Sequence, residues 1–123
     1  MAAPYAGPDD AARADAFFAG RPAAQALFTA IADLLADHGD VTVTATKVRV
    51  CVKARTRFLY CPQTYTDGRI ILRFLLPYAL EGDWHQMPAG GRVAHRVTLG
   101  RIEDAPMDLF RAALEVDLAA SAR

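Results

Sequence analysis

Several features that would assign a function directly are scarce or missing in this sequence of 123 residues. Two cysteines, Cys51 and Cys61, are too few for a disulfide framework. The longest apolar run, at 70–76, is interrupted by Arg73 and is too short to cross a bilayer. Phosphate-loop, dinucleotide-binding and nucleophile-elbow motifs are also missing. The sequence therefore excludes a helical membrane span, a disulfide scaffold and the commonest nucleotide-dependent enzymes.

Neither net charge nor a targeting segment points to a partner. Lys and Arg number 14 and so do Asp and Glu, which leaves a formal net charge of zero. The N-terminus carries Asp9 and Asp10 in place of a basic segment followed by an apolar one, so it does not resemble a secretory signal. Apolar residues make up 53% of the chain, enough for a packed core. We expect a cytoplasmic protein with a flexible tail at 1–8 and a single domain at 9–123.

Helical periodicity occurs at both ends of the chain. The Ala-rich segment 9–18 predicts a short helix that ends near Gly20, and the apolar stripe of 22–39 predicts a longer one. Near the C-terminus, Asp104 is suited to cap a third helix whose apolar stripe runs from Met107 to Leu118.

Alternating apolar and polar residues predict strands between these helices. The alternation in 41–46 changes phase in 48–53, which we interpret as one long strand with a bulge at Thr46 and Lys47; a turn is the alternative. Further strands are expected at 58–61, 69–76 and 92–99, with Pro62 ending the first of them and an irregular loop at 78–91.

This order predicts the fold class. Two helices, about four strands and one helix follow each other without alternation of strands and crossover helices. We therefore expect an α+β fold, an antiparallel sheet with two N-terminal helices and one C-terminal helix packed on one face.

Three segments resemble a known family. Residues 41–47 (VTVTATK), residues 91–99 (GRVAHRVTL) and the opening 17–22 (FFAGRP) are similar to short bacterial members of the domain of unknown function 5655 family, over roughly residues 16–118. The resemblance implies a small α+β domain without a settled activity, some of whose relatives resemble accessory domains beside nucleases. Lys47 and His95 stand at positions that match the polar motifs of the family.

Charge is unevenly distributed along the chain. Residues 41–80 contain seven basic residues and one acid, Asp67, whereas the rest contains seven basic and thirteen acidic residues. Strand alternation puts Arg49, Arg73 and Arg96 on the face opposite the apolar residues. Such a face can hold a phosphate-bearing ligand or single-stranded nucleic acid, although few aromatic residues are near. The alternative is a solvated face whose charged side chains disfavour pairing of the edge strands with other chains.

The candidate site residues are His95, Lys47, Tyr60 and Trp84. His95 alternates with Val93 and Val97, so its ring is expected on the core face, as a general base, a ligand-binding group or a structural histidine. Lys47 at the bulge is expected either to point into a cleft beside His95 or to be exposed. Trp84 in the long loop fits a lid or an anchor.

These residues support three hypotheses. The leading hypothesis is a non-enzymatic binding or accessory module for an anionic small molecule or protein partner. The second is a cofactor-free acid–base enzyme in which His95 is the catalytic base or acid, Lys47 or Arg73 stabilises negative charge and Tyr60 donates a proton. The third is a nucleic-acid-associated domain that uses the basic sheet face. No cofactor, metal or membrane is expected, and a homodimer is a further hypothesis that the opposed charges suggest. The predicted ligand-binding residues are Lys47, Arg49, Arg73, Trp84, His95 and Arg96.

Overall fold

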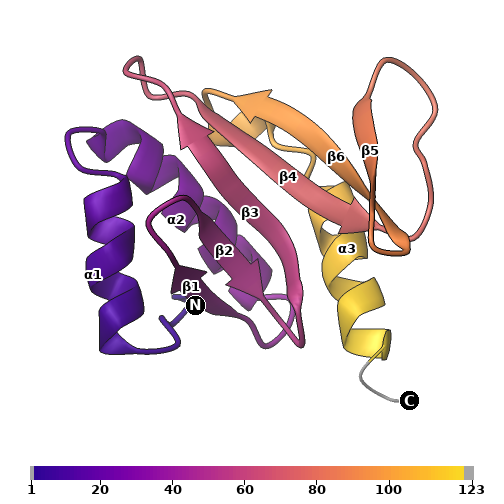
Figure 1. Ribbon diagram of the computed structural model, residues 1–123, viewed down its shortest axis with the longest axis horizontal. Coiled ribbons are helices and arrows are strands. Elements are labelled where there is room, and N and C mark those ends of the chain that lie inside the picture. Colours follow the sequence, from indigo (N-terminus) through magenta and orange to yellow (C-terminus); the bar gives the residue numbers. More distant parts are fainter. Residues whose placement is uncertain (1, 121–123) are drawn as a thin grey trace.

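The computed structural model describes residues 2–120, so residue 1 of the predicted tail and 121–123 of the predicted domain lie outside it. The described range has three α-helices and a six-stranded antiparallel sheet, which confirms the α+β prediction (Figure 1). None of these helices is long and apolar enough to cross a membrane. The elements are α1 (Pro8–Phe17), α2 (Pro22–Ala36), β1 (Thr42–Ala45), β2 (Val50–Lys53), β3 (Arg57–Thr64), β4 (Ile70–Leu76), β5 (His85–Ala89), β6 (Arg92–Leu99), a 3₁₀ turn (Ile102–Asp104) and α3 (Met107–Ala120).

The strands follow the order β1-β2-β3-β4-β6-β5. The sheet has two strands more than expected. One arises because residues 41–53 form a hairpin, and the predicted bulge is wrong: Thr46 N donates to Arg49 O (2.9 Å) across a turn that joins Ala45 to its partner Val50. Cross-strand partners point to the same face, so a four-residue turn produces the change of phase seen in the sequence.

The other additional strand, β5, lies in the segment expected to be an irregular loop. Its five residues pair with β6, and Ala89 lies opposite Arg92 across the two-residue turn Gly90-Gly91. Both glycines have positive φ, 60° and 85°, as a tight hairpin turn of this length requires. Pro88 is tolerated because β5 is an edge strand whose outer side needs no ladder hydrogen bonds.

Two expected boundaries also differ from the structure. Pro62 does not end β3, which continues to Thr64 through a register shift between Tyr60 and Gln63. Asp104 does not cap the last helix, because it ends a 3₁₀ turn and α3 begins only after Pro106. At Pro62 the strand absorbs the proline through this register shift and continues beyond it, whereas at Pro106 the 3₁₀ turn has already ended and α3 begins after the proline.

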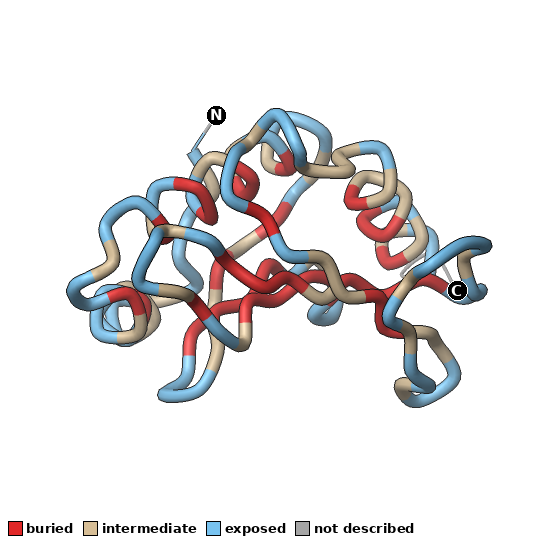
Figure 2. The backbone as a smooth tube through the Cα atoms, turned by 90° about the horizontal axis from the view of Figure 1, so that it is seen from above, coloured by how far each residue is buried: buried red, intermediate tan, exposed pale blue. Residues whose placement is uncertain are grey.

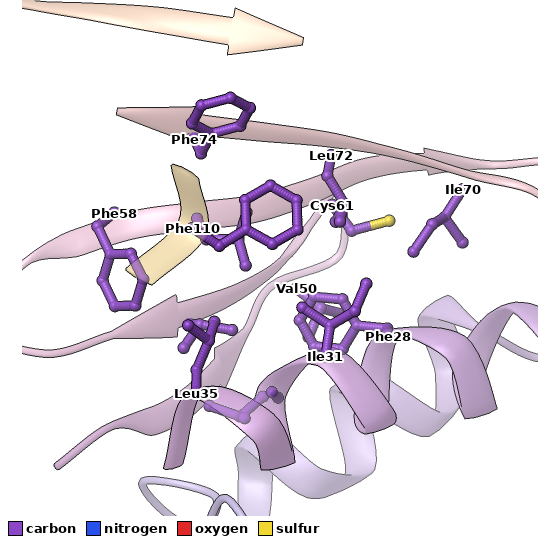
Figure 3. Packing of buried hydrophobic residues seen from close by; sticks show 14 of the residues in the cluster. Phe28, Ile31, Leu35, Val50, Phe58, Cys61, Ile70, Leu72, Phe74 and Phe110 are labelled. Atoms are coloured by element: carbon purple, nitrogen blue, oxygen red, sulfur yellow. The ribbon is translucent and has the colours of Figure 1, made fainter. Parts of the chain in front are cut away.

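The core lies between the sheet and the helices. Figure 2 shows the sheet from its edge, with helical coils packed over one side of it. Phe110 of α3 packs on Phe74 of β4, and Phe28, Ile31 and Leu35 of α2 face the core residues of β2 and β3 (Figure 3). The opposite face of the sheet, called the open face below, is covered by no helix within residues 2–120.

The N-terminal segment is joined to β1 and α2. Val43 N donates to Pro4 O (2.8 Å), and Ala6 N donates to Val43 O (2.9 Å). Ala3 N donates to Asp33 Oδ1 of α2 (2.9 Å). The segment therefore covers the outer edge of β1, with α1 beside it (Figure 1). Covering an edge strand in this way removes a surface on which other chains could pair.

Candidate functional site

His95 lies on the helix-covered face of the sheet and is completely buried, which confirms its predicted placement. Its ring packs against Phe74 and Trp84, with centroid distances of 5.2 and 6.3 Å. Nε2 lies 3.1 Å from Tyr78 O, so it carries the proton and donates to that carbonyl. The buried Nδ1 has no hydrogen-bond partner in the described chain. His95 therefore has no access to a ligand in solvent.

Burial lowers the pKa of His95, because the charged imidazolium is poorly solvated there, and the Tyr78 hydrogen bond opposes this shift only in part. A lowered pKa in the folded state means that the unfolded chain binds a proton first as the pH falls. We therefore expect the contribution of His95 to stability to be complete above its ordinary pKa of about 6.5 and to be lost progressively below it.

The pH dependence can be measured by urea unfolding between about pH 7.5 and 5.5, the range around that ordinary pKa. We expect the free energy of unfolding of the wild type to fall with pH in this range and His95→Phe to abolish the fall. Val48→Ala, at an exposed position without a titratable group, serves as the control and should keep the fall in stability. An equal pH dependence in His95→Phe and wild type would contradict a buried neutral ring.

Lys47 does not lie beside His95. It is exposed in the β1–β2 turn, and strands β3 and β4 separate β2 from β6. Because neighbouring strands are about 4.8 Å apart, β2 and β6 are separated by roughly 14 Å. Of its two expected positions, Lys47 has the exposed one, since the hairpin turn projects it into solvent where a bulge would have turned it inward.

Trp84 packs on the core beside Phe74 and not over a pocket, with ring centroids 5.8 Å apart. The loop before it is fixed by Gln86, whose side chain accepts from Leu80 N (2.6 Å) and donates to Leu80 O (2.9 Å). Of its two expected roles, Trp84 has that of an anchor for the loop.

A row of polar side chains crosses the open face at one register of the sheet. Arg73 of β4 lies directly opposite Tyr60 of β3 on one side and Arg96 of β6 on the other. His85 of β5 lies opposite Arg96 and completes this part of the row. Directly opposed residues point to the same face, so Arg73, Arg96 and His85 form a cationic group that we call the arginine–histidine cluster.

A hollow of about 200 Å³ lies at this cluster. Neither Asp nor Glu lines it, and neither arginine forms an ion pair with any residue between 2 and 120. Like charges directly opposed across two strands destabilise a sheet, so the pair has an electrostatic cost that the described chain does not offset. The lining residues are Arg73, His85, Gln86, Met87, Ala94 and Arg96.

The sequence pattern predicts Arg73 and Arg96 on this face but does not predict His85 there. Its segment was expected to be an irregular loop, in which no face can be assigned. The signal that could have placed His85 is the Gly90-Gly91 pair, which is typical of a tight hairpin turn and predicts a strand before it.

Tyr60 forms a second group on the open face with Arg49 and Arg57. Their guanidinium carbons lie 5.5 and 4.6 Å from the centre of the Tyr60 ring, within cation–π range. We call these three residues the tyrosine cluster. Tyr60 is 9% exposed and points away from His95, which lies on the other face. The structure thus brings Arg49 to Tyr60 and Arg73 to Arg96, but does not unite His95, Lys47, Tyr60 and Arg73.

The two cysteines lie on adjacent strands but on opposite faces. Cys61 belongs to the core, where burial raises its pKa to about 12, and Cys51 lies on the open face opposite Tyr60, where burial also raises its pKa despite nearby Arg57. Both are free thiols. Between residues 2 and 120, no group of three His, Cys, Asp or Glu side chains is placed to hold a metal ion.

Comparison with known proteins leaves the family open. The chain matches no model of a protein family, no curated protein and no solved structure. The resemblance to the domain of unknown function 5655 family stays a prediction.

Proposed function

We propose that this protein is a non-enzymatic binding module that holds an anionic group in the hollow at the arginine–histidine cluster. The observation that carries the proposal is the direct opposition of Arg73 and Arg96 without an internal carboxylate. A bound oxyanion would offset their repulsion and accept charge-assisted hydrogen bonds from both guanidinium groups. An N–H group of the His85 ring adds a third donor to the same anion.

The enzyme hypothesis is less well supported by this geometry. It required His95 to share a site with Tyr60 and Arg73, but their side chains lie on opposite faces of the sheet. A general base must come within hydrogen-bond reach of the proton that it removes. His95 cannot do so for a ligand on the open face unless the sheet itself rearranges.

The proposal is tested with inorganic phosphate and the double variant Arg73→Gln/Arg96→Gln. Each hydrogen bond to a charged group contributes about 1.5–3 kcal/mol, so we expect the variant to bind phosphate at least about a hundredfold more weakly. Titration of backbone amide shifts measures the affinity, with the largest changes expected in β4, β5 and β6. The variant should also be as stable as the wild type or more stable, by a few tenths of a kcal/mol, because the like-charge pair is gone.

The control variant is Arg13→Gln/Arg101→Gln. It removes the same charge from α1 and from the segment after β6, where both arginines already have carboxylate neighbours. Its phosphate affinity should equal that of the wild type. If both double variants bind phosphate equally well, or if the wild type does not bind it, the hollow is not an anion site and the proposal is wrong.

Location and assembly belong to the same proposal. We place the protein in the cytoplasm, where the buried thiols of Cys51 and Cys61 stay reduced. A homodimer formed through the opposed charges would have to bring acidic helical residues onto the open face and would compete with the anion. Sedimentation at low salt, with and without phosphate, distinguishes such a dimer from a monomer that binds the anion.

A further inference from the structure

The open face has more positive charge than one small anion can neutralise. Besides the arginine–histidine cluster, it carries the tyrosine cluster on the adjoining strands, because Tyr60 lies directly opposite Arg73. Arg57 lies in turn directly opposite Lys53, so a second like-charge pair occurs on neighbouring strands. Neither Arg49 nor Arg57 forms an ion pair with a residue in the range 2–120.

The arginines of the tyrosine cluster are arranged to bind anions. A cation–π contact uses the face of the guanidinium group and holds the side chain in place, while its N–H groups at the edge stay available to an acceptor. Holding the side chain in advance lowers the entropy lost on binding. Tyr60 therefore acts as a support for two anion-binding groups, and its own ring is too covered to stack on a ligand.

The two adjoining clusters together extend over a longer distance than a single small anion covers. The row from Tyr60 on β3 to His85 on β5 crosses three strand spacings, which amounts to roughly 14 Å. The hollow itself, at about 200 Å³, is smaller than the roughly 300–1,000 Å³ of a typical small-molecule pocket. A ligand that contacts both clusters must carry negative charges repeated along its length.

We propose that the open face binds single-stranded nucleic acid, with phosphates running from the arginine–histidine cluster to the tyrosine cluster. This inference rests on the proposed anion site. Four of the cations are arginines, whose planar forks match phosphate oxygens. An open sheet face suits a single strand, whereas a duplex is read by elements that enter its grooves. Because the Tyr60 ring is covered, recognition depends on the backbone and has little base preference.

The test uses a fluorescent oligonucleotide of twelve thymidines and measures anisotropy over a range of salt concentrations. For single strands, the logarithm of the affinity falls with the logarithm of salt by about 0.7 for each phosphate neutralised. With four arginines engaged, the expected slope is about −2.8. Arg49→Gln/Arg57→Gln and Arg73→Gln/Arg96→Gln should each reduce its size by about 1.4, and the control Arg13→Gln/Arg101→Gln should leave it unchanged.

Inorganic phosphate separates this inference from the proposed function. Arg49→Gln/Arg57→Gln should weaken oligonucleotide binding but bind phosphate like the wild type, because both residues lie outside the hollow. If phosphate binds and the oligonucleotide does not, the nucleic-acid inference is wrong and the anion site stands. If neither binds, both are wrong. A circular dichroism spectrum and urea midpoint like those of the wild type are required of each variant, and Arg57→Lys, which keeps the charge, should retain most of the affinity.

Two competitors decide the class of ligand. A duplex of the same sequence and a hexaglutamate peptide are each added to the preformed complex. The inference expects displacement only at much higher concentrations than those of unlabelled oligonucleotide. Equal displacement by hexaglutamate would show a surface for acidic peptides, and equal displacement by duplex would show a surface without strand preference; either result overturns the assignment.

Discussion

Asp117→Ala is expected to destabilise the protein by about 3–5 kcal/mol. Asp117 lies on α3, is 4% exposed, and accepts hydrogen bonds from the backbone N–H groups of Arg55 (2.8 Å) and Thr56 (3.0 Å) and from the Thr56 hydroxyl. Removing the carboxylate leaves these donors of the β2–β3 turn without their acceptor. Urea unfolding monitored by circular dichroism measures the loss.

Two further variants make the Asp117 result specific. Asp117→Asn keeps one side-chain oxygen and should lose less stability than Asp117→Ala. Asp108→Ala removes a fully exposed carboxylate from the first turn of the same helix, where a weak pair with Arg111 is lost, so we expect a much smaller change in stability than for Asp117→Ala. A loss below about 1 kcal/mol for Asp117→Ala would show that the turn does not depend on this carboxylate.

Phe110→Ala is expected to cost a similar amount, about 3–5 kcal/mol. Phe110 is completely buried where α3 packs on the sheet, and its ring lies 5.2 Å from that of Phe74 in an edge-to-face arrangement (Figure 3). Truncation removes the apolar area that it buries and leaves a cavity that helix and strand cannot both close. The free energy of unfolding in urea is again the measurement.

The controls for Phe110 test the cavity explanation. Phe110→Leu fills most of the space and should cost clearly less than Phe110→Ala. Val48→Ala, at a 62% exposed position in the β1–β2 turn, should change stability by less than about 0.5 kcal/mol. If Phe110→Ala and Val48→Ala have equal effects, α3 does not contribute to the core as the structure indicates.

The opposed arginines make the sheet less stable, and we propose that they enable it to bind anions. Arg73 and Arg96 occupy strands at the centre of the sheet and next to its edge, where uncharged polar side chains would cost less. On the helix-covered face, by contrast, His95 is buried among aromatic rings, which disfavours its charged form. The two faces thus use ionisable residues in opposite ways, exposing charge on one and excluding it on the other.

The sequence by itself determined the class of the fold and the chemical character of each face. Apolar residues recur with the helical period of about 3.6 residues in α2 and with a period of two in the strands, and both patterns are set by residues close together in the chain. Alternation in β6 therefore located His95 on the core face and Arg96 on the other before any strand was paired. Asp117 also had a local signal, since it follows Phe110 and Leu114 at helical spacing and so lies on the buried stripe of α3.

The tertiary structure decided which of these residues meet. Whether residues 41–53 bend or turn depends on whether Ala45 and Val50 can pair, and the sequence pattern is compatible with both. Strand order then separated Lys47 from His95, and β5 brought His85 to Arg96. Pairing joins segments that are far apart in the chain, and its free energy depends on the whole sheet and the helices packed on it. Periodicity therefore assigned side chains to faces, and only the folded sheet could assemble them into a site.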